Sequence, residues 1–130
     1  MAWQCAAGST LLIPSGPAGS HLFVVLNNPT DFEGHPAQSC ISVAICSIRK
    51  GPYDTTLVLQ PGAGMHPFVK QPSYVAFRHA RLDTAAHLRG LVDAQTAFPR
   101  DPVSVDLLNL IGSGVQNSQQ TPNYIKALLA

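Results

Sequence analysis

Charged residues are scarce in this chain of 130 residues, because Asp, Glu, Lys and Arg together make up only 12%, roughly half the fraction usual for soluble proteins. Hydrophobic residues make up 45%. A surface so poor in charge is expected to be covered in part by a partner. A homodimer is the simplest partner, since a two-fold interface needs only one self-complementary patch. The length suits one domain, so we expect residues 1–130 to form a single domain that dimerises.

The chain also lacks a strong excess of either sign of charge. Its formal net charge is +1, which excludes the general attraction to nucleic acid shown by strongly basic domains. Positive charge nevertheless collects in the middle third, where Asp54 is the one acidic residue among the cations Arg49, Lys50, Lys70, Arg78 and Arg81. This cluster is interpreted either as a phosphate-binding face or as ordinary solvated surface.

Long hydrophobic runs are missing as well. No stretch approaches the roughly 20 apolar residues of a membrane span. The first residues carry no basic region of the kind that begins a secretory signal. We therefore expect a soluble cytoplasmic protein with no membrane partner.

Cysteine is rare and unpatterned. The odd number of cysteines and the absence of a Cys-x-x-Cys pair predict neither a disulfide framework nor a zinc site, so buried free thiols are expected. Histidine pairs likewise lack the spacing that fixes a metal ligand set. We expect no metal and no cofactor. The residues concerned are Cys5, Cys40, Cys46, His35, His66 and His79.

Short segments rich in Val, Ile, Leu and Phe, separated by Pro and Gly, fill the first two thirds of the chain and are typical of strands. The predicted strands are residues 10–13, 21–27, 40–47, 55–60 and 73–79. Turn-forming residues over 28–39 predict a long loop. Short strands at this spacing suit a small barrel or curled sheet.

Helical spacing of apolar residues begins after His79. Residues 84–92 form one candidate helix. Asp101-Pro102 predicts the start of a second helix that ends near Gly112 and Gly114, and Thr121-Pro122 predicts the start of a last short one. The fold class is therefore mainly β with helices in the C-terminal part.

Three segments of the chain follow one another in an order that is informative when they are taken together. They are Gly8-Ser9-Thr10-Leu11-Leu12-Ile13-Pro14 with His21-Leu22-Phe23-Val24-Val25-Leu26, then Ile45-Cys46-Ser47, and then Ser73-Tyr74-Val75-Ala76-Phe77. In this order they resemble the PemK/MazF-like family of small SH3-like barrels, which includes growth-inhibiting toxins. The resemblance implies an SH3-like β-barrel over about residues 8–82, with helices packed on it over about 83–130.

The resemblance also implies a function. Active members of that family are metal-independent endoribonucleases held by an antitoxin protein. They commonly use an Arg at the start of the second strand and a Thr or Ser at the end of the third. Here His21-Leu22 stand at the Arg-Pro position and Cys46 at the Thr position, with Ser47 beside it. His21 and Ser47 are therefore candidate catalytic residues, and the alternative for His21 is a half-buried imidazole at the start of a strand.

RNA cleavage without a metal needs a base, an acid and cations that stabilise the phosphorane. Arg78-His79-Ala80-Arg81 offers an imidazole between two cations. Strand alternation predicts that His79 and Arg81 share the face of Val75 and Phe77 while Arg78 points away. His79 and Arg81 are thus candidate catalytic residues, unless the chain simply becomes polar as it reaches solvent. The candidate substrate-binding residues are Arg78, Arg49, Lys50, His66 and Ser73.

Two functions remain open. One is an RNA-binding protein, active or weakened as an endoribonuclease and paired with an antitoxin. The other is a non-catalytic relative that keeps the barrel as a protein-interaction module, which the replaced Arg and Thr favour.

Overall fold

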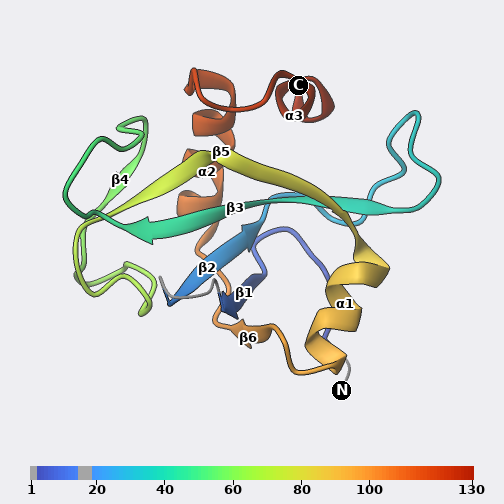
Figure 1. Ribbon diagram of the computed structural model, residues 1–130, viewed down its shortest axis with the longest axis horizontal. Coiled ribbons are helices and arrows are strands. Elements are labelled where there is room, and N and C mark those ends of the chain that lie inside the picture. Colours follow the sequence, from blue (N-terminus) through green and yellow to red (C-terminus); the bar gives the residue numbers. More distant parts are fainter. Residues whose placement is uncertain (1–2, 15–18) are drawn as a thin grey trace.

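The computed structural model describes residues 3–14 and 19–130, and its main feature is one antiparallel sheet with helices in the C-terminal part (Figure 1). The sheet has six strands in the order β4-β5-β3-β2-β1-β6 and curls into a half barrel. The elements are β1 Thr10–Pro14, β2 Ser20–Val25, β3 Ser39–Ser47, β4 Val58–Leu59, β5 Ser73–Thr84, α1 Ala85–Asp93, β6 Phe98–Arg100, α2 Val105–Asn117 and α3 Asn123–Leu129. The predicted class, mainly β with C-terminal helices, is confirmed.

The larger hydrophobic core lies on the sheet face that α2 and α3 cover. Alternate residues of β2, β3 and β5 point to this face, as Leu22, Ile45 and Val75 do in one row across the three strands. The helices contribute the buried side chains of Ile111 and Ile125. Their burial follows from the three-to-four spacing of apolar residues, which puts one face of each helix on the sheet.

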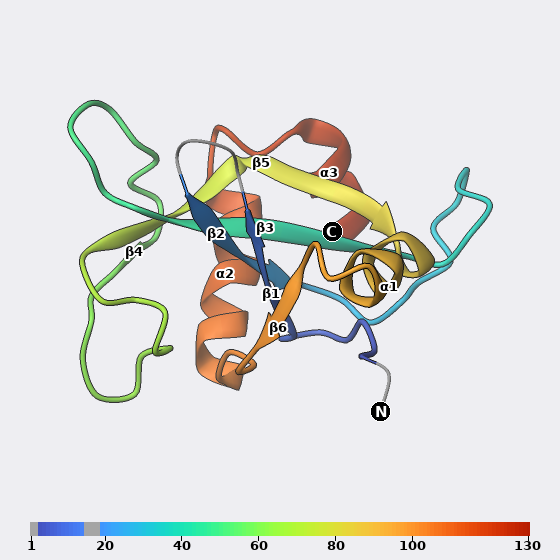
Figure 2. The ribbon, with the colours of Figure 1, turned by 60° about the horizontal axis from the view of Figure 1, so that its bottom comes forward.

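A second, smaller core lies on the opposite face of the sheet, beneath α1. It contains Leu11 of β1, Val25 of β2 and Leu88 of α1. Figure 2 shows α1 close to the N-terminal segment, and Figure 1 shows it on the other side of the sheet from α2 and α3. The two faces are therefore covered by different helices, and only part of the second face is covered by α1.

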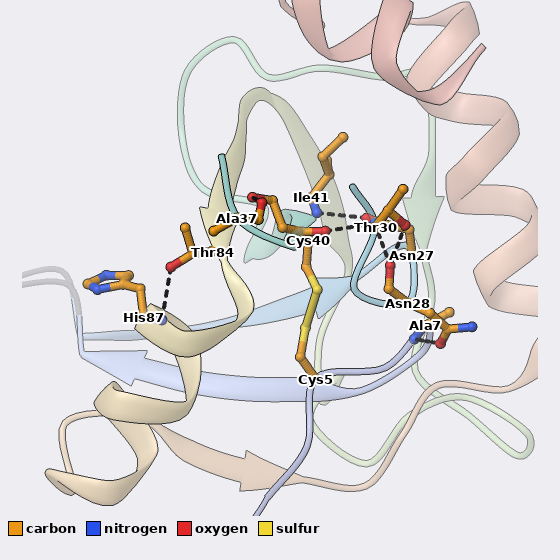
Figure 3. The surroundings of a disulfide bond; sticks show 11 residues. Cys5, Ala7, Asn27, Asn28, Thr30, Ala37, Cys40, Ile41, Thr84 and His87 are labelled. Atoms are coloured by element: carbon orange, nitrogen blue, oxygen red, sulfur yellow. Dashed lines mark hydrogen bonds between the residues drawn. A yellow bond between two sulfur atoms is a disulfide. The ribbon is translucent and has the colours of Figure 1, made fainter. Parts of the chain in front are cut away.

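Cys5 and Cys40 meet in this second core and form a disulfide (Figure 3). The prediction of free thiols is wrong for these two residues and holds for Cys46. Sequence spacing gave no signal, because the pair is joined by the sheet order, which lays the segment before β1 near β3. Beside the bond, the backbone N–H of Ile41 donates to Asn27 Oδ1 at 2.7 Å and anchors the chain after β2.

The strand limits differ from the predicted ones mainly at the sheet edges. β4 is only Val58–Leu59, and β5 continues to Thr84 because its second half pairs with the first half of β3. The short strand β6 was not predicted, since Phe98-Pro99-Arg100 lacks alternation and carries a proline, which suits an edge strand. Across residues 3–14 and 19–130, no helix combines the length and hydropathy needed to cross a membrane.

Helix limits were predicted well in one case and less well in two. Thr84 caps α1 by accepting a hydrogen bond from the His87 N–H at 3.0 Å, close to the predicted start. α2 starts three residues later than predicted, after the N-cap Ser104. The reason is that the Asp101 carbonyl is already held, by the Thr10 hydroxyl at 2.8 Å.

The C-terminal ends of the helices also depart from the predictions. α2 continues through Gly112 and Gly114 to Asn117, because both glycines adopt helical backbone there. α3 begins after Pro122, and its first turn has no side-chain cap. Thr121 is therefore not the predicted cap, and its buried Oγ1 has no hydrogen-bond partner within the described ranges.

Candidate functional site

A groove lies on the part of the second sheet face that α1 leaves uncovered. Its cavity volume is about 780 Å³. Residues from β2, β3, β5, the segment after β3, and α3 line it. Four candidate catalytic residues and two of the candidate cations are among them: His21, Ser47, His79, Arg81, Arg49 and Lys50.

The floor of the groove is set by the strand register. His21 precedes Leu22, which pairs with Ile45, while Cys46 pairs with Tyr74. His21, Cys46 and Tyr74 therefore form a row across three adjacent strands, with neighbouring strands about 4.8 Å apart. They point away from the larger core because the residues next to them point into it.

An irregularity in β5 brings His79 and Arg81 into the same groove. Ser42 pairs with Arg81 and Ala44 with Ala76, so β3 contributes only Val43 where β5 contributes residues 77–80. Phe77 is fully buried in the larger core, whereas His79 and Arg81 are exposed to the groove. The predicted face was thus wrong, because the bulge breaks the strict alternation on which it was based.

Positive charge dominates the groove wall. Arg49 and Lys50 are exposed and follow β3, and Arg81 comes from β5. Asp83 is the one carboxylate among the lining residues, and it forms a salt bridge with Arg81, with Nε to Oδ2 at 2.7 Å. Once that pair is neutralised, Arg49 and Lys50 leave a net positive charge for an anionic ligand.

Aromatic rings form the remaining walls. Tyr53 and Tyr74 are in contact, with ring centroids 5.3 Å apart and planes tilted by 38°. Phe23 of β2 and Tyr124 of α3 line the groove as well. These rings were not named as site residues, because only the fold brings Tyr124 of the last helix beside β5, which ends 40 residues earlier, at Thr84. Its exposure of 54%, large for an aromatic residue in an apolar helix stripe, fits this position at the groove.

The thiol and the phenol at the floor are both held in their protonated forms. Burial raises the pKa of the Cys46 thiol, and a hydrogen bond with Tyr74 offsets this only in part. Burial raises the pKa of Tyr74 too, and the nearby Cys46 adds to the rise. A thiol with a raised pKa is a poor nucleophile at neutral pH. Among the other lining side chains, the imidazoles of His21 and His79 can act as an acid or a base.

Arg78 lies in a second hollow that continues from the groove. The two hollows share His79, Tyr53 and Tyr74, and the second one also contains Asp54. Arg78 therefore lies on the same side as His79, contrary to the predicted alternation. Its charge lies close enough to Tyr74 to act on that side chain's pKa.

Two candidate substrate-binding residues, His66 and Ser73, lie outside both hollows. His66 is buried, its Nδ1 accepts the Phe68 N–H at 3.0 Å, and its Nε2 donates to the Asp101 carbonyl at 2.6 Å. Ser73 is buried, and its hydroxyl donates to the Gln71 carbonyl at 2.9 Å. Both side chains hold loop structure and line neither hollow that contains His79.

A buried hydrogen bond fixes the segment that carries Tyr53. The Ser118 hydroxyl donates to Asp54 Oδ2 at 2.6 Å and ties this segment to the end of α2. Burial acts to raise the pKa of Asp54, but hydrogen bonds from Ser118 and Thr56 outweigh it, so the pKa lies below its ordinary value. The ionised Asp54 therefore stabilises the fold, and this contribution is lost as pH falls through the lowered pKa.

Ser118→Ala is expected to lower the free energy of unfolding by about 1.5–3 kcal/mol at pH 7, because it removes a hydrogen bond to a buried charge. The loss should shrink below the folded-state pKa of Asp54, where the carboxyl is neutral in both variants. Urea unfolding at pH 7 and at a pH low enough to protonate the Asp54 carboxyl measures both values. Ser113→Ala, an exposed substitution on α2, is the control. An equal loss at both pH values would contradict the assignment to Asp54.

No cluster of three or more His, Cys, Asp or Glu that could hold a metal occurs in the part of the chain that the structure describes. Comparison with known proteins finds no matching family model, no similar curated protein and no similar solved structure. The residues of the groove are therefore what indicates a function for this chain.

Proposed function

We propose that the groove binds RNA and cleaves it without a metal ion, as an endoribonuclease. The proposal is supported mainly by two imidazoles, those of His21 and His79, which lie 58 residues apart in the sequence and line the same groove. Three cations line it with them: Arg49, Lys50 and Arg81. Two imidazoles can supply the base that takes the 2′-hydroxyl proton and the acid that protonates the leaving oxygen. The cations suit the phosphate between them.

The aromatic walls support RNA over other phosphate compounds. Tyr53, Tyr74 and Tyr124 lie around the groove with the cations. Rings beside basic residues are typical of sites where bases stack and phosphates pair with cations. The same function is what the resemblance to PemK/MazF-like toxins implies. An antitoxin partner and a homodimer belong to this proposal too.

The test is incubation of the purified protein with a long RNA that has paired and unpaired regions, in EDTA. The expected result is a set of defined fragments ending in 2′,3′-cyclic phosphate, because attack by the 2′-hydroxyl forms that ring. Gel separation and mass spectrometry of the ends give the measurement. Intact RNA that also fails to shift in a binding assay would overturn the proposal and leave the groove as a protein-interaction surface. Growth arrest on expression would be expected only for the active protein.

A further inference from the structure

The Arg81–Asp83 pair is the best-defined interaction in the groove. Arg81 donates from Nε to Asp83 Oδ2 at 2.7 Å and from Nη2 to Oδ1 at 3.2 Å. Both residues lie on β5 two positions apart, so they share a face. The carboxylate therefore accepts two parallel contacts from the Nε–Nη2 edge of the guanidinium, a bidentate geometry that fixes the orientation of the Arg side chain.

The other edge of the Arg81 guanidinium is left open. A guanidinium has five N–H donors in a fixed fork, and the pair with Asp83 uses one on Nε and one on Nη2. Nη1 has no acceptor among residues 3–14 and 19–130. The Arg81 side chain is 50% exposed and lines the groove. An anion in the groove can therefore reach the Nη1–Nη2 edge, which matches two phosphate oxygens.

The Asp83 side chain is largely buried beside apolar residues of α1. Its side chain is only 12% exposed, and it borders a small apolar cavity of about 50 Å³ that Leu88 and Leu91 of α1 also line. A carboxylate beside apolar side chains is stable only when it is paired. Asp83 therefore lies between apolar side chains of α1 on one side and Arg81, its ion-pair partner, on the other.

We infer that Asp83 is a positioning residue, which fixes Arg81 by its Nε edge so that the Nη1–Nη2 edge faces a phosphate group of the RNA. This inference rests on the proposed function of the groove. Without Asp83 the Arg81 side chain would have to be ordered when RNA binds, which weakens binding. The opposite role, in which Asp83 competes with phosphate for Arg81, predicts the opposite sign for the same substitution.

The experiment measures binding of an unstructured fluorescent oligoribonucleotide over a range of salt concentrations, in EDTA and with variants checked for folding by thermal unfolding. The 2′-hydroxyls of the probe are methylated, so that the protein cannot cleave it during the measurement. Asp83→Asn keeps the shape of the side chain and removes its charge. It should weaken binding on the order of tenfold and reduce the slope of log K against log salt by about 0.7, the value for one lost phosphate contact with a single strand. Asp93→Asn, an exposed carboxylate at the end of α1, is the control for net charge and should change neither quantity.

Two further variants test whether Asp83 acts through Arg81. Adding Asp83→Asn to Arg81→Ala should cause no additional loss, since the residue to be positioned is gone. Arg81→Lys leaves Asp83 in place and keeps the charge but loses the fork, so it should weaken binding severalfold. Tighter or unchanged binding by Asp83→Asn, with wild-type RNA binding intact, would overturn only this inference. Absence of RNA binding by the wild type would overturn the proposed function and this inference with it.

Discussion

Replacing Gly114 by alanine is expected to destabilise the protein by about 2 kcal/mol, although alanine normally favours a helix over glycine by about 1 kcal/mol. A Cβ built on Gly114 overlaps the Phe77 ring, with Cε2 at 3.0 Å, Cε1 at 3.2 Å and Cζ closer still. Phe77 is fully buried in the larger core, so its ring cannot move without displacing its neighbours. α2 approaches β5 this closely only because residue 114 has no side chain.

Gly112 is the matched control, because it lies in the same helix and a Cβ there would meet nothing within 4 Å. Gly112→Ala should stabilise the protein by about 0.5–1 kcal/mol through helix propensity alone. Urea unfolding of both variants gives the comparison. Adding Phe77→Leu to Gly114→Ala should recover part of the loss, since the smaller side chain makes room. Equal stabilities of the two alanine variants would show that the contact with Phe77 is not tight.

Loss of either groove imidazole should abolish most of the RNA cleavage. His79→Gln and His21→Gln are each expected to slow cleavage by about 10²–10⁴-fold, the usual contribution of a general base or acid. RNA binding should change much less, because glutamine keeps hydrogen-bonding capacity and the cations remain. Single-turnover cleavage rates and binding constants, measured with the same RNA in EDTA, separate the two effects.

His87→Gln is the control for these variants. His87 is exposed on α1 and does not line the groove, so its replacement should leave the cleavage rate unchanged. Cleavage by both His→Gln variants at the wild-type rate would mean that another group carries out the proton transfers, or that the activity is a contaminant.

The elements that the sequence predicted best are those whose pattern is local. Alternating apolar residues located β2 and β3 within a few positions, and the helical spacing of apolar residues over 84–92 located α1, because both patterns depend on near neighbours. β6 and the Cys5–Cys40 disulfide depend on which strands come together across the sheet. Nothing in the neighbouring residues could have indicated them.

Several residues of the groove could be named as candidates from the sequence, whereas the surface that they form could not. His21, Ser47 and His79 were singled out by residue type and by resemblance, and the structure brings them to one groove. Tyr124 and Asp83 were not, since their importance comes from packing across the fold. The predicted orientation of His79 was wrong because it assumed strict alternation along β5. The register shift between β3 and β5 breaks that alternation, and the sequence gives no sign of it.

The three surplus residues of β5 opposite Val43 have a consequence for how related chains should be compared. The two halves of this strand have different registers with β3, so the alternation of core and groove residues in one half does not continue into the other. A relative whose bulge is shorter or longer would keep both halves while shifting every later residue in number. An alignment that places no gap near residues 77–80 would then match groove residues with core residues. Homologues of this chain are best aligned from each end of β5 inward.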